Sequence, residues 1–589
     1  MIRTALVLMA LALPLCAAMT GANAQAKFED LGVFLGKGGA MSTLVGPGPN
    51  GTERLYVCYT YISSLDLVAY DPDTGHAQVW HNPEGGAWAM ENGPDSCLYL
   101  GTYFNGHILK LDPQTGELKD LGQAIPGETY IWQLSLGPDK KLYGCTYPGA
   151  KLLQFDPATG AMTDLGRMDP TQNYNRTLYA APDGWVYCAI GSEKADLVAY
   201  NPQTKERRSL IPEAEREPGF GQIVRGADGI AYGTCNGKSY RLHEGAATPI
   251  DALPAAMPRT RLKNGKEAVE PNTYPGRELP IFRIAAGPDG KLYGSAILPE
   301  YLLRFDPADK KPVTMGLIPG AEAYSMLAAH DRLYIASYTG ATLQIYDPAK
   351  PFDPGAERSK NPAYYGSTAP EQDRPYDITL GADGKVYLAC VPSYGHHGGA
   401  ISWYDPKTDT LGYAFAPVAE QAVASICALP DGLLVGGTSI EGGPGTQPRA
   451  KEAVLFLWDT ARREKVFECV PVPGASIIVN LARGGDGLVY GTAGGKVFVF
   501  DPKARKALAQ TALKQGGVAR AGLLTLDDGR VVALAGSSAL FLRYAGGRWQ
   551  ARTFAQADAA LSVGKAVIGE WLYAVTDKHL VRCRIPRKR

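Results

Sequence analysis

Neither sign of charge is in excess in this 589-residue sequence, because 59 lysines and arginines balance 59 aspartates and glutamates. No overall electrostatic field therefore attracts the chain to nucleic acid or to an anionic membrane, and we expect no nucleic-acid partner. G-x-S-x-G, P-loop and H-E-x-x-H motifs are also absent. Their absence argues against serine hydrolases, P-loop enzymes and zinc proteases, and we predict no cofactor.

Long apolar runs are missing after the amino terminus. Arg3 precedes an apolar run over residues 5–18, and Ala22-Asn23-Ala24 has the A-x-A pattern of signal-peptidase cleavage. We therefore expect a signal peptide over residues 1–24. No later stretch reaches the 18 apolar residues that a transmembrane helix requires. The mature protein is predicted to be periplasmic or secreted, with no integral membrane segment after signal cleavage.

Cysteine pairs with metal or redox spacing are missing as well. Without Cys16, nine cysteines remain, which is an odd number for an oxidising compartment, and no C-x-x-C pair occurs. Several stand in short apolar segments, where a thiol packs like a small hydrophobic residue. We expect mostly buried, unreactive thiols and predict no metal site.

Glycine (69 residues) and proline (43 residues) are abundant, and they mark the turns of an internal repeat. Each unit has a Leu-Tyr strand, a second apolar strand ending in Asp-Pro, a turn, a third strand, and a fourth strand leading to a Gly-Pro-Asp-Gly turn. Three clear copies are CLYLGTYFNGHILKLDPQTGELKDLG at 97–122, KLYGCTYPGAKLLQFDPATGAMTDLG at 141–166 and KLYGSAILPEYLLRFDPADKKPVTMG at 291–316. Further copies end at Asp71, Asn201, Asp347, Asp405, Asp459 and Asp501, with degenerate units around His243, Tyr544 and Arg582.

The Asp-Pro positions are spaced by roughly 40–45 residues, which is the length of one four-stranded propeller blade. The spacing predicts an all-β protein, a β-propeller of about twelve four-stranded units. Single propellers typically hold four to eight blades, so two propellers in tandem are expected. We also expect the repeated Tyr ring to pack between blades with its hydroxyl on a backbone group.

The widest gap in the repeats sets the predicted domain boundaries. Residues 25–243 form a first propeller, residues 244–280 a linker or insertion, and residues 281–589 a second propeller. The last unit stops after three strands, and residues 25–35 offer a strand that would close it and remove an unpaired edge. Five plus seven blades follow from that closure, and six plus six fits almost as well.

These D-G-x-L-Y…L-x-x-F-D-P-x-T-G units resemble the superfamily of secreted bacterial propellers that includes NHL-repeat, virginiamycin-B-lyase-like and gluconolactonase-like proteins. The resemblance covers nearly the whole mature chain and implies the fold and an exported location. Streptogramin lyases of this group show Trp-Phe-Thr-Glu where this chain has Leu-Tyr-Gly-Cys-Thr-Tyr at 142–147. That activity is therefore not implied, and no specific enzyme family is matched.

Aromatic and cationic residues gather where propellers bind ligands. Loops before the innermost strand and after the Leu-Tyr strand emerge on one face around the central channel. Rings can stack on pyranose faces, and Arg can hold a carboxylate through two parallel hydrogen bonds. The candidate substrate-binding residues are Trp132, Arg176, Arg283, Tyr324, Asp377 and Arg449.

Three extra segments, 361–377, 392–399 and 439–452, belong to two neighbouring units and suggest a catalytic site. Cleavage of a uronic-acid glycan by a lyase needs a carboxylate clamp, a base and an acid. Ulvan and oligogalacturonide lyases are propellers that use His, Tyr and Arg in this way, an analogy of fold and compartment. The candidate catalytic residues are Arg374 as clamp, His396 or His397 as base, and Tyr394 or Tyr376 as acid or stacking platform.

Two functions remain open at this point. The first is an exported protein that binds or degrades carbohydrate, with a polysaccharide lyase acting on acidic glycan as its enzymatic form. The second is a non-enzymatic scaffold whose extra loops dock an envelope protein partner. Whether the protein is an enzyme is left open by the sequence.

Overall fold

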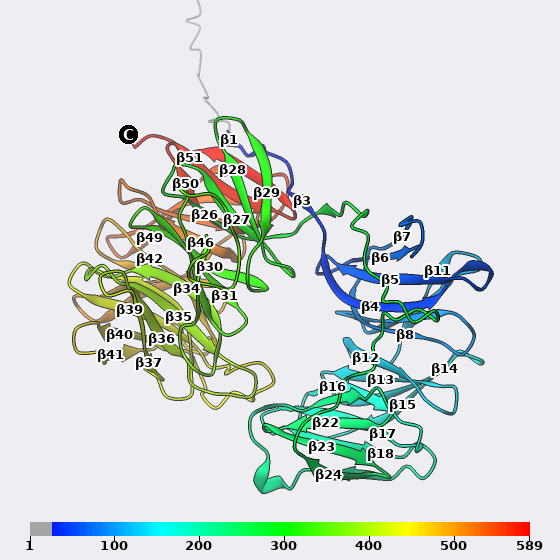
Figure 1. Ribbon diagram of the computed structural model, residues 1–589. Coiled ribbons are helices and arrows are strands. Elements are labelled where there is room, and N and C mark those ends of the chain that lie inside the picture. Colours follow the sequence, from blue (N-terminus) through cyan, green and yellow to red (C-terminus); the bar gives the residue numbers. More distant parts are fainter. Residues whose placement is uncertain (1–25, 589) are drawn as a thin grey trace, which may run out of the picture.

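The computed structural model describes residues 26–588, which form an all-β protein (Figure 1). Two 3-10 helices, η1 (Pro49–Gly51) and η2 (Glu213–Glu215), interrupt the strands, and the described residues contain no α-helix. None of their helices is long and apolar enough to cross a membrane. The predicted fold class is confirmed. The predicted signal peptide lies outside the described residues.

Five blades, each built on four antiparallel strands, form the five-bladed unit over residues 39–250, and the pairing of Tyr130 with Tyr103 joins blades 2 and 3 into one sheet. Blade 1 contains β4 (Gly39–Pro47), β5 (Glu53–Thr60), β6 (Leu65–Tyr70) and β7 (Ala77–Asn82). Blade 2 contains β8 (Gly86–Asn92), β9 (Leu98–Tyr103), β10 (His107–Asp112) and β11 (Glu117–Gln123). Blade 3 contains β12 (Tyr130–Leu136), β13 (Leu142–Tyr147), β14 (Lys151–Asp156) and β15 (Ala161–Arg167). Blade 4 contains β16 (Tyr174–Ala180), β17 (Val186–Ser192), β18 (Asp196–Tyr200) and β19 (Arg207–Ser209), and β20 (Gly219–Phe220) pairs with β17. Blade 5 contains β21 (Gln222–Arg225), β22 (Ala231–Cys235), β23 (Lys238–His243) and β24 (Ala246–Ile250).

Seven further blades form the seven-bladed unit, and the pairing of Arg520 with Val563 joins blades 11 and 12 into one sheet. Blade 6 contains β26 (Ile281–Ala286), β27 (Leu292–Ala296), β28 (Tyr301–Asp306) and β29 (Lys311–Leu317). Blade 7 contains β30 (Glu322–Ala329), β31 (Arg332–Tyr338), β32 (Thr342–Tyr346) and β33 (Ala363–Ser367). Blade 8 contains β34 (Gln372–Leu380), β35 (Val386–Pro392), β36 (Ala400–Asp405) and β37 (Thr410–Phe415), and blade 9 contains β38 (Ala422–Ala428), β39 (Leu433–Ser439), β40 (Leu455–Asp459) and β41 (Glu464–Cys469). Blade 10 contains β42 (Ile478–Arg483), β43 (Val489–Ala493), β44 (Lys496–Asp501) and β45 (Lys506–Ala512), and blade 11 contains β46 (Val518–Thr525), β47 (Val531–Ala535), β48 (Ser538–Ala545) and β49 (Arg548–Gln556). Blade 12 contains β50 (Leu561–Ile568), β51 (Trp571–Thr576), β52 (His579–Arg584) and, from the start of the chain, β2 (Glu29–Asp30).

The amino-terminal strands close the seven-bladed unit. β2 runs antiparallel to β52, and the Arg582 guanidinium donates to the Glu29 carboxylate at 2.8 Å. β1 (Ala26–Lys27) lies parallel to β49 in the neighbouring blade. Because β26 of blade 6 packs against β50 of blade 12, the innermost strands make a complete ring. Because β2 pairs with β52, the outer edge of β52 is not left open where the two strands run side by side.

The five-bladed unit closes in another way. Ala227 N–H donates to the Ala255 carbonyl and Met257 N–H to the Arg225 carbonyl, each at 2.9 Å. Val45 N–H of β4 then donates to the Arg259 carbonyl at 2.8 Å. The segment between residues 255 and 259 therefore lies between blade 5 and blade 1 and satisfies backbone groups on both. Part of the predicted linker or insertion is thus built into the ring, because an open ring would leave those groups unpaired.

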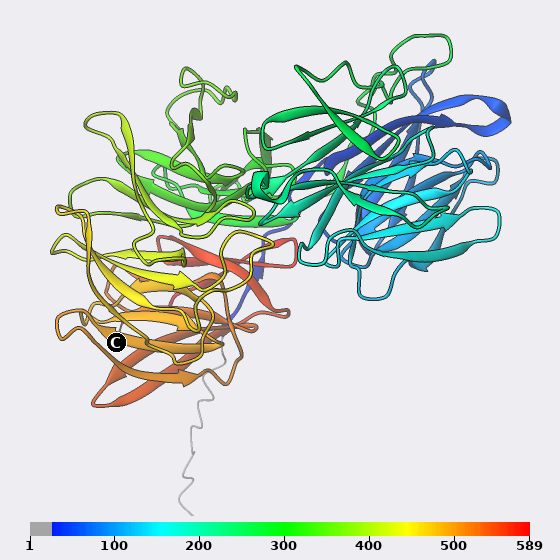
Figure 2. The same ribbon diagram turned by 90° about the horizontal axis from the view of Figure 1, so that it is seen from below.

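The chain crosses between the two units twice, and the two crossings pair with each other (Figures 1 and 2). β3 (Leu35–Gly36) runs from the seven-bladed unit to the five-bladed unit, and β25 (Arg277–Glu278) returns antiparallel to it. Phe34 and Leu279, beside these strands, share one buried core with Tyr61 of the five-bladed unit and Tyr573 of the seven-bladed unit. The units are therefore joined by packed side chains as well as by the chain.

The repeated Tyr rings are buried, as the repeat predicts, but most of their hydroxyls do not bond a backbone group as expected. Tyr99 donates to the Asp95 carboxylate at 2.9 Å, and Tyr143 donates to Asp139 at 2.8 Å. The same pairing, four residues apart, recurs in five further blades: Tyr187 with Asp183, Tyr232 with Asp228, Tyr293 with Asp289, Tyr387 with Asp383 and Tyr490 with Asp486. The carboxylate accepts because the Asp of the preceding turn folds back over the strand. Among the repeat tyrosines of residues 26–588, only Tyr56, whose turn lacks that Asp, donates to a backbone carbonyl, that of Pro47, at 2.6 Å.

Candidate functional site

A β-bulge in nearly every innermost strand turns a side chain toward the central channel. In β12 the pairing with β13 shifts between Ile131 and Gln133, which leaves Trp132 outside the ladder. A bulge inserts an extra residue and re-aims its side chain, often beside a functional site. The residues at bulges of the other innermost strands include Met41, Trp88, Arg176, Phe282, Tyr324, Tyr376, Ala424, Asn480, Arg520 and Lys565. All of these bulged residues except Phe282 line one of two channel cavities.

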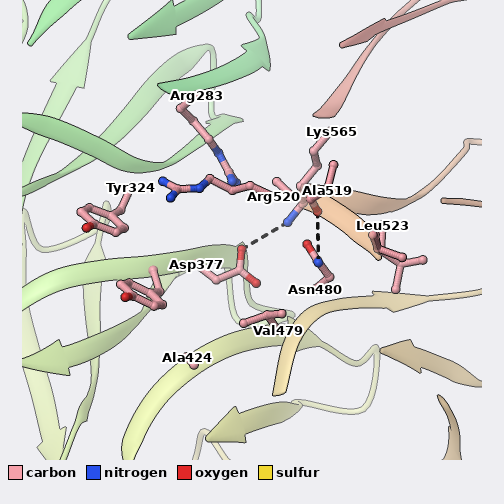
Figure 3. Close-up of a pocket in the computed structure, with 13 residues that line it drawn as sticks. Arg283, Tyr324, Asp377, Ala424, Val479, Asn480, Ala519, Arg520, Leu523 and Lys565 are labelled. Carbon is pink, nitrogen blue, oxygen red and sulfur yellow. Dashed lines mark hydrogen bonds and ion pairs between the residues drawn. The ribbon is translucent and has the colours of Figure 1, made fainter. Parts of the chain in front are cut away.

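The channel of the seven-bladed unit holds a cavity of about 300 Å³ (Figure 3). Six bulged residues line it, together with Arg283 and Asp377, which directly follow bulges in β26 and β34. Figure 3 shows Arg283, Arg520 and Lys565 pointing toward a common space. Three cations and one carboxylate thus face this cavity, which gives it a net positive charge.

Arg283 is the most unusual group in the cavity. Its residue is only 3% exposed, and its Nε has no hydrogen-bond partner. Among residues 26–588 no carboxylate lies within ion-pair distance of its guanidinium. Burial lowers the pKa of Arg283 from its ordinary value to about 10, while the charge of Asp377 opposes this shift. Since burying an unpaired charge is costly, this arrangement is typical of a site that awaits an anion.

Both carboxylate oxygens of Asp377 contact other residues of the seven-bladed unit. One carboxylate oxygen lies 3.2 Å from the Lys565 ammonium, and the other accepts the backbone N–H of Ile426 at 3.2 Å. Asn480 donates through its amide nitrogen to the Ala519 carbonyl at 3.3 Å. These contacts fix the floor and sides of the cavity and leave the Arg283 and Arg520 guanidinium groups free of acidic partners in the described chain.

Tyr324 and Tyr376 form the rim of the cavity. Their rings stack with centroids 5.0 Å apart and planes 6° apart, and both residues are partly exposed. The Arg520 guanidinium lies 5.7 Å from the Tyr324 ring and 3.9 Å from the Phe282 ring. Burial raises the pKa of Glu322, which begins β30 beside Tyr324, although the Tyr324 hydroxyl and two nearby arginines oppose this shift. The rim therefore combines flat rings, cations and one carboxyl group.

Arg374 and Tyr394 are brought together beside this rim. Arg374 donates to the Tyr394 hydroxyl at 3.2 Å and lies 3.2 Å from the Asp373 carboxylate. Its guanidinium stacks on the ring of Tyr338, 4.3 Å from the centroid. Burial disfavours the charged form of Arg374, but the surrounding tyrosines and Asp373 outweigh it and raise the pKa. Two of the predicted catalytic residues thus form a direct pair.

The two predicted bases face other groups. His397 has a side chain 8% exposed, and its Nε2 lies 3.1 Å from Oε1 of Glu193, in the five-bladed unit. His396 Nδ1 lies 3.4 Å from the Glu371 carboxylate. Arg449 of the second extra loop lies 3.0 Å from Glu420 and 3.9 Å from Glu193. The extra loops at 392–399 and 439–452 therefore dock on blade 4, and their histidine and arginine side chains contribute to the inter-propeller contact.

The channel of the five-bladed unit holds a second cavity, of about 420 Å³, lined by Trp88, Trp132, Arg176 and Arg259 among others. Trp88 and Trp132 stack with centroids 4.4 Å apart. The Arg176 guanidinium lies 4.7 Å from the ring of Phe220 and has no acidic partner among the described residues. Arg259 enters from the closing segment and donates to the Met90 carbonyl. Trp132 and Arg176 thus belong to another channel than Arg283, Tyr324, Tyr376 and Asp377.

Sequence reasoning missed Arg520, Lys565 and Glu322. The first two lie in blades 11 and 12, where the repeat is degenerate and the bulges are enlarged, so that their register could not be aligned. Glu322 could have been found, because it pairs with Tyr338 as Tyr130 pairs with Tyr147 in blade 3. No group of three or more His, Cys, Asp or Glu side chains that could hold a metal occurs in the described part of the chain. Its nine cysteines form no disulfide.

No known protein family and no curated protein matches the chain. Among solved structures, hydrazine synthase of Kuenenia stuttgartiensis is similar over 53% of this chain and 98% of its own, with 15% identity and a TM-score of 0.42. PorZ, a surface component of the type-IX secretion system of Porphyromonas gingivalis, is similar over 94% and 86%, with 11% identity and a TM-score of 0.39. The extracellular domain of the putative one-component system BT4673 of B. thetaiotaomicron is similar over 95% and 77%, with 13% identity and a TM-score of 0.33. Similarity at this level does not bear on function.

Proposed function

We propose that the protein is an exported carbohydrate-binding propeller whose seven-bladed channel recognises an acidic sugar. One observation carries the proposal, namely the buried, unpartnered guanidinium of Arg283 in a cavity that it shares with Arg520 and Lys565. A carboxylate ligand would supply the missing partner through charge-assisted hydrogen bonds. The export part of the proposal rests on the amino-terminal sequence pattern.

The rim supports a sugar rather than a bare inorganic anion. Tyr324 and Tyr376 present rings on which the apolar face of a pyranose can stack, and their hydroxyls can bond sugar hydroxyls. A cavity of about 300 Å³ also falls at the lower end of the range for small-molecule sites. A uronic acid combines the carboxylate and the ring that these two features fit.

A lyase reaction is the narrower form of this proposal, favoured by the contact between Arg374 and Tyr394. Arg374 would hold the uronate carboxylate, and a base, His396 in preference to the interface residue His397, would take the proton at C5. The C5–H electrons would form the C4=C5 bond as the C4–O bond breaks. Tyr394 would give its proton to the leaving oxygen. Release of an unsaturated uronate, seen by ultraviolet absorbance, tests this step.

Binding is tested by isothermal titration calorimetry with galacturonate, glucuronate and mannuronate oligomers and with their methyl esters, which remove the charge. We expect the acids to bind and the esters to bind at least about tenfold more weakly, because a charge-assisted hydrogen bond contributes about 1.5–3 kcal/mol. Arg283→Gln and Arg520→Gln should each reduce affinity for the acids. Equal binding of acids and esters would contradict the proposal.

A charge change in the opposite direction provides the matched control. Glu322→Gln removes a negative charge from the same rim and keeps the size of the side chain. We expect it to raise the affinity for an acidic sugar by about fivefold, equivalent to about 1 kcal/mol, since it removes like-charge repulsion. A general loss of structure would lower affinity in all three variants, so the opposite signs separate electrostatics from misfolding. If the protein were instead a scaffold, no variant would change glycan binding, and an envelope protein would co-purify.

A further inference from the structure

We infer that the ligand is an acidic oligosaccharide that extends across both propellers along a row of arginines and aromatic rings. The inference rests on the proposed function and extends it from one sugar to a chain. The row, called here the Arg–aromatic track, consists of Arg520, Tyr324, Tyr376, Arg374, Tyr394, Arg176, Trp132 and Trp88. Its two ends are the two channel cavities.

Tyr394 links the two halves of the track. Its ring lies 5.1 Å from the Arg374 guanidinium of the seven-bladed unit and 5.6 Å from the Arg176 guanidinium of the five-bladed unit. It also packs against Tyr174 and Phe220 of blade 4. An aromatic ring between two arginines, one from each propeller, makes the track continuous over the interface.

Most steps along the track are similar in length, from 4.4 Å between the Trp132 and Trp88 rings to 5.7 Å between the Arg520 guanidinium and the Tyr324 ring. Arg176 lies 5.6 Å from the ring of Trp132, which stacks on Trp88 at 4.4 Å. On the other side, Tyr324 stacks on Tyr376 at 5.0 Å, and Arg374 stands two residues before Tyr376 on β34. Steps of this size are close to the length of one pyranose ring. A chain with one carboxylate per sugar would therefore place carboxylates near the arginines and sugar rings near the aromatic rings.

The track residues differ from the tyrosines of the repeat in their exposure. The repeat rings, such as Tyr99 and Tyr143, are buried between blades. Every residue of the track is partly or fully exposed, Arg520 the most. Neither Arg520 nor Arg176 has a carboxylate partner among residues 26–588. Accessible rings, together with two arginines that lack an acidic partner, point to a ligand rather than to core packing.

The experiment measures affinity against chain length. Isothermal titration calorimetry is carried out with galacturonate, glucuronate and mannuronate oligomers of one to eight sugars. We expect the tightest-binding series to gain at least about 100-fold from the monomer to the longest chain, since linked contacts reinforce each other. Arg176→Gln and Trp132→Ala, in the five-bladed unit, should abolish most of that gain. Trp132→Phe, which keeps a ring, should restore part of it.

The outcomes separate the two proposals. Equal affinity for all chain lengths, with acids still preferred over methyl esters, would overturn the track and leave the single-sugar site. Equal binding of acids and esters, or no binding of either, would overturn both. Tighter binding of a single-stranded oligonucleotide than of any uronate chain would also overturn the track. A circular dichroism spectrum and a melting temperature for each variant ensure that lost length dependence reflects lost contacts.

Discussion

Individual hydrogen bonds between Tyr and Asp join a strand to the preceding turn in seven blades. In blade 2, Asp95 accepts from Tyr99 and also lies 2.8 Å from the Lys110 ammonium. Burial alone would raise the pKa of Asp95, but the Lys110 and Tyr99 hydrogen bonds outweigh it, and the pKa is lowered. The carboxylate is therefore more stable charged in the folded state than in the unfolded chain. Its contribution to stability depends on pH.

We expect Tyr99→Phe to lower the free energy of unfolding by about 1–2 kcal/mol near neutral pH. Because the pKa of Asp95 is lower in the folded state, this contribution is present above about pH 3.9, its unfolded pKa, and is lost as the pH falls through the folded value. Urea unfolding of wild type and variant at several pH values measures the difference. Tyr56→Phe is the control, since its hydroxyl bonds the Pro47 carbonyl and its effect should not follow that titration.

Arg283 is the opposite case to Asp95, because its charged form is less stable in the folded state than in the unfolded chain. Burial lowers the pKa of Arg283 to about 10, so below that pH the folded state carries the full penalty of a buried cation. We expect Arg283→Met to raise the free energy of unfolding by about 0.5–2 kcal/mol while abolishing binding of acidic sugars. Thermal unfolding and calorimetric titration of the same preparation test both effects. A variant that is destabilised and still binds would show that Arg283 is a structural residue.

At the scale of strands, the sequence predicts the blades well and the bulges poorly. Asp-Pro turns and Leu-Tyr strands are local patterns, and they lead directly to the four-stranded sheets. Trp132 and Tyr324 could be placed near a channel because their blades keep the repeat. Arg520 could not, since four residues of β46 stand opposite one residue of β47 and shift the alignment. A bulge depends on local twist and on neighbouring strands, which no single repeat encodes.

The β2 strand supports a prediction about blade closure. Removing residues 26–30 would expose the outer edge of β52 and leave the Arg582 guanidinium without Glu29. We expect a loss of about 2–4 kcal/mol in unfolding free energy, from the missing backbone and charge-assisted hydrogen bonds. Self-association should also increase, because an open edge pairs with other edges. Calorimetry and light scattering measure these effects, and Lys578→Ala, in the partly exposed turn before β52, should change neither.

At the scale of the whole molecule, the two propellers are held at two places. The paired crossings β3 and β25 join them through a shared core. On the other side, Glu193 of blade 4 receives the extra loops of the seven-bladed unit, with His397 Nε2 at 3.1 Å and Gln447 N–H donating at 3.5 Å. The sequence shows that these loops are longer than the blades need. It does not show what they contact, because docking between distant units is decided by shape rather than by a local pattern.

We expect Glu193→Ala to loosen the loop contact while leaving both propellers folded. A hydrogen bond to a charged group contributes about 1.5–3 kcal/mol, so amide hydrogen exchange in loops 392–399 and 439–452 should become at least about tenfold faster. Exchange in the innermost strands should not change. The matched control is Glu213→Ala, since Glu213 pairs with Lys194 at 2.8 Å within the same unit and does not reach the loops.

Unchanged exchange in both loops would mean that Tyr394 and the backbone contacts, such as Ser192 Oγ donating to the Pro444 carbonyl at 3.0 Å, hold the interface without Glu193. Because Tyr394 belongs to the first of these loops, a loosened contact should also weaken binding of long acidic chains more than binding of a single sugar acid.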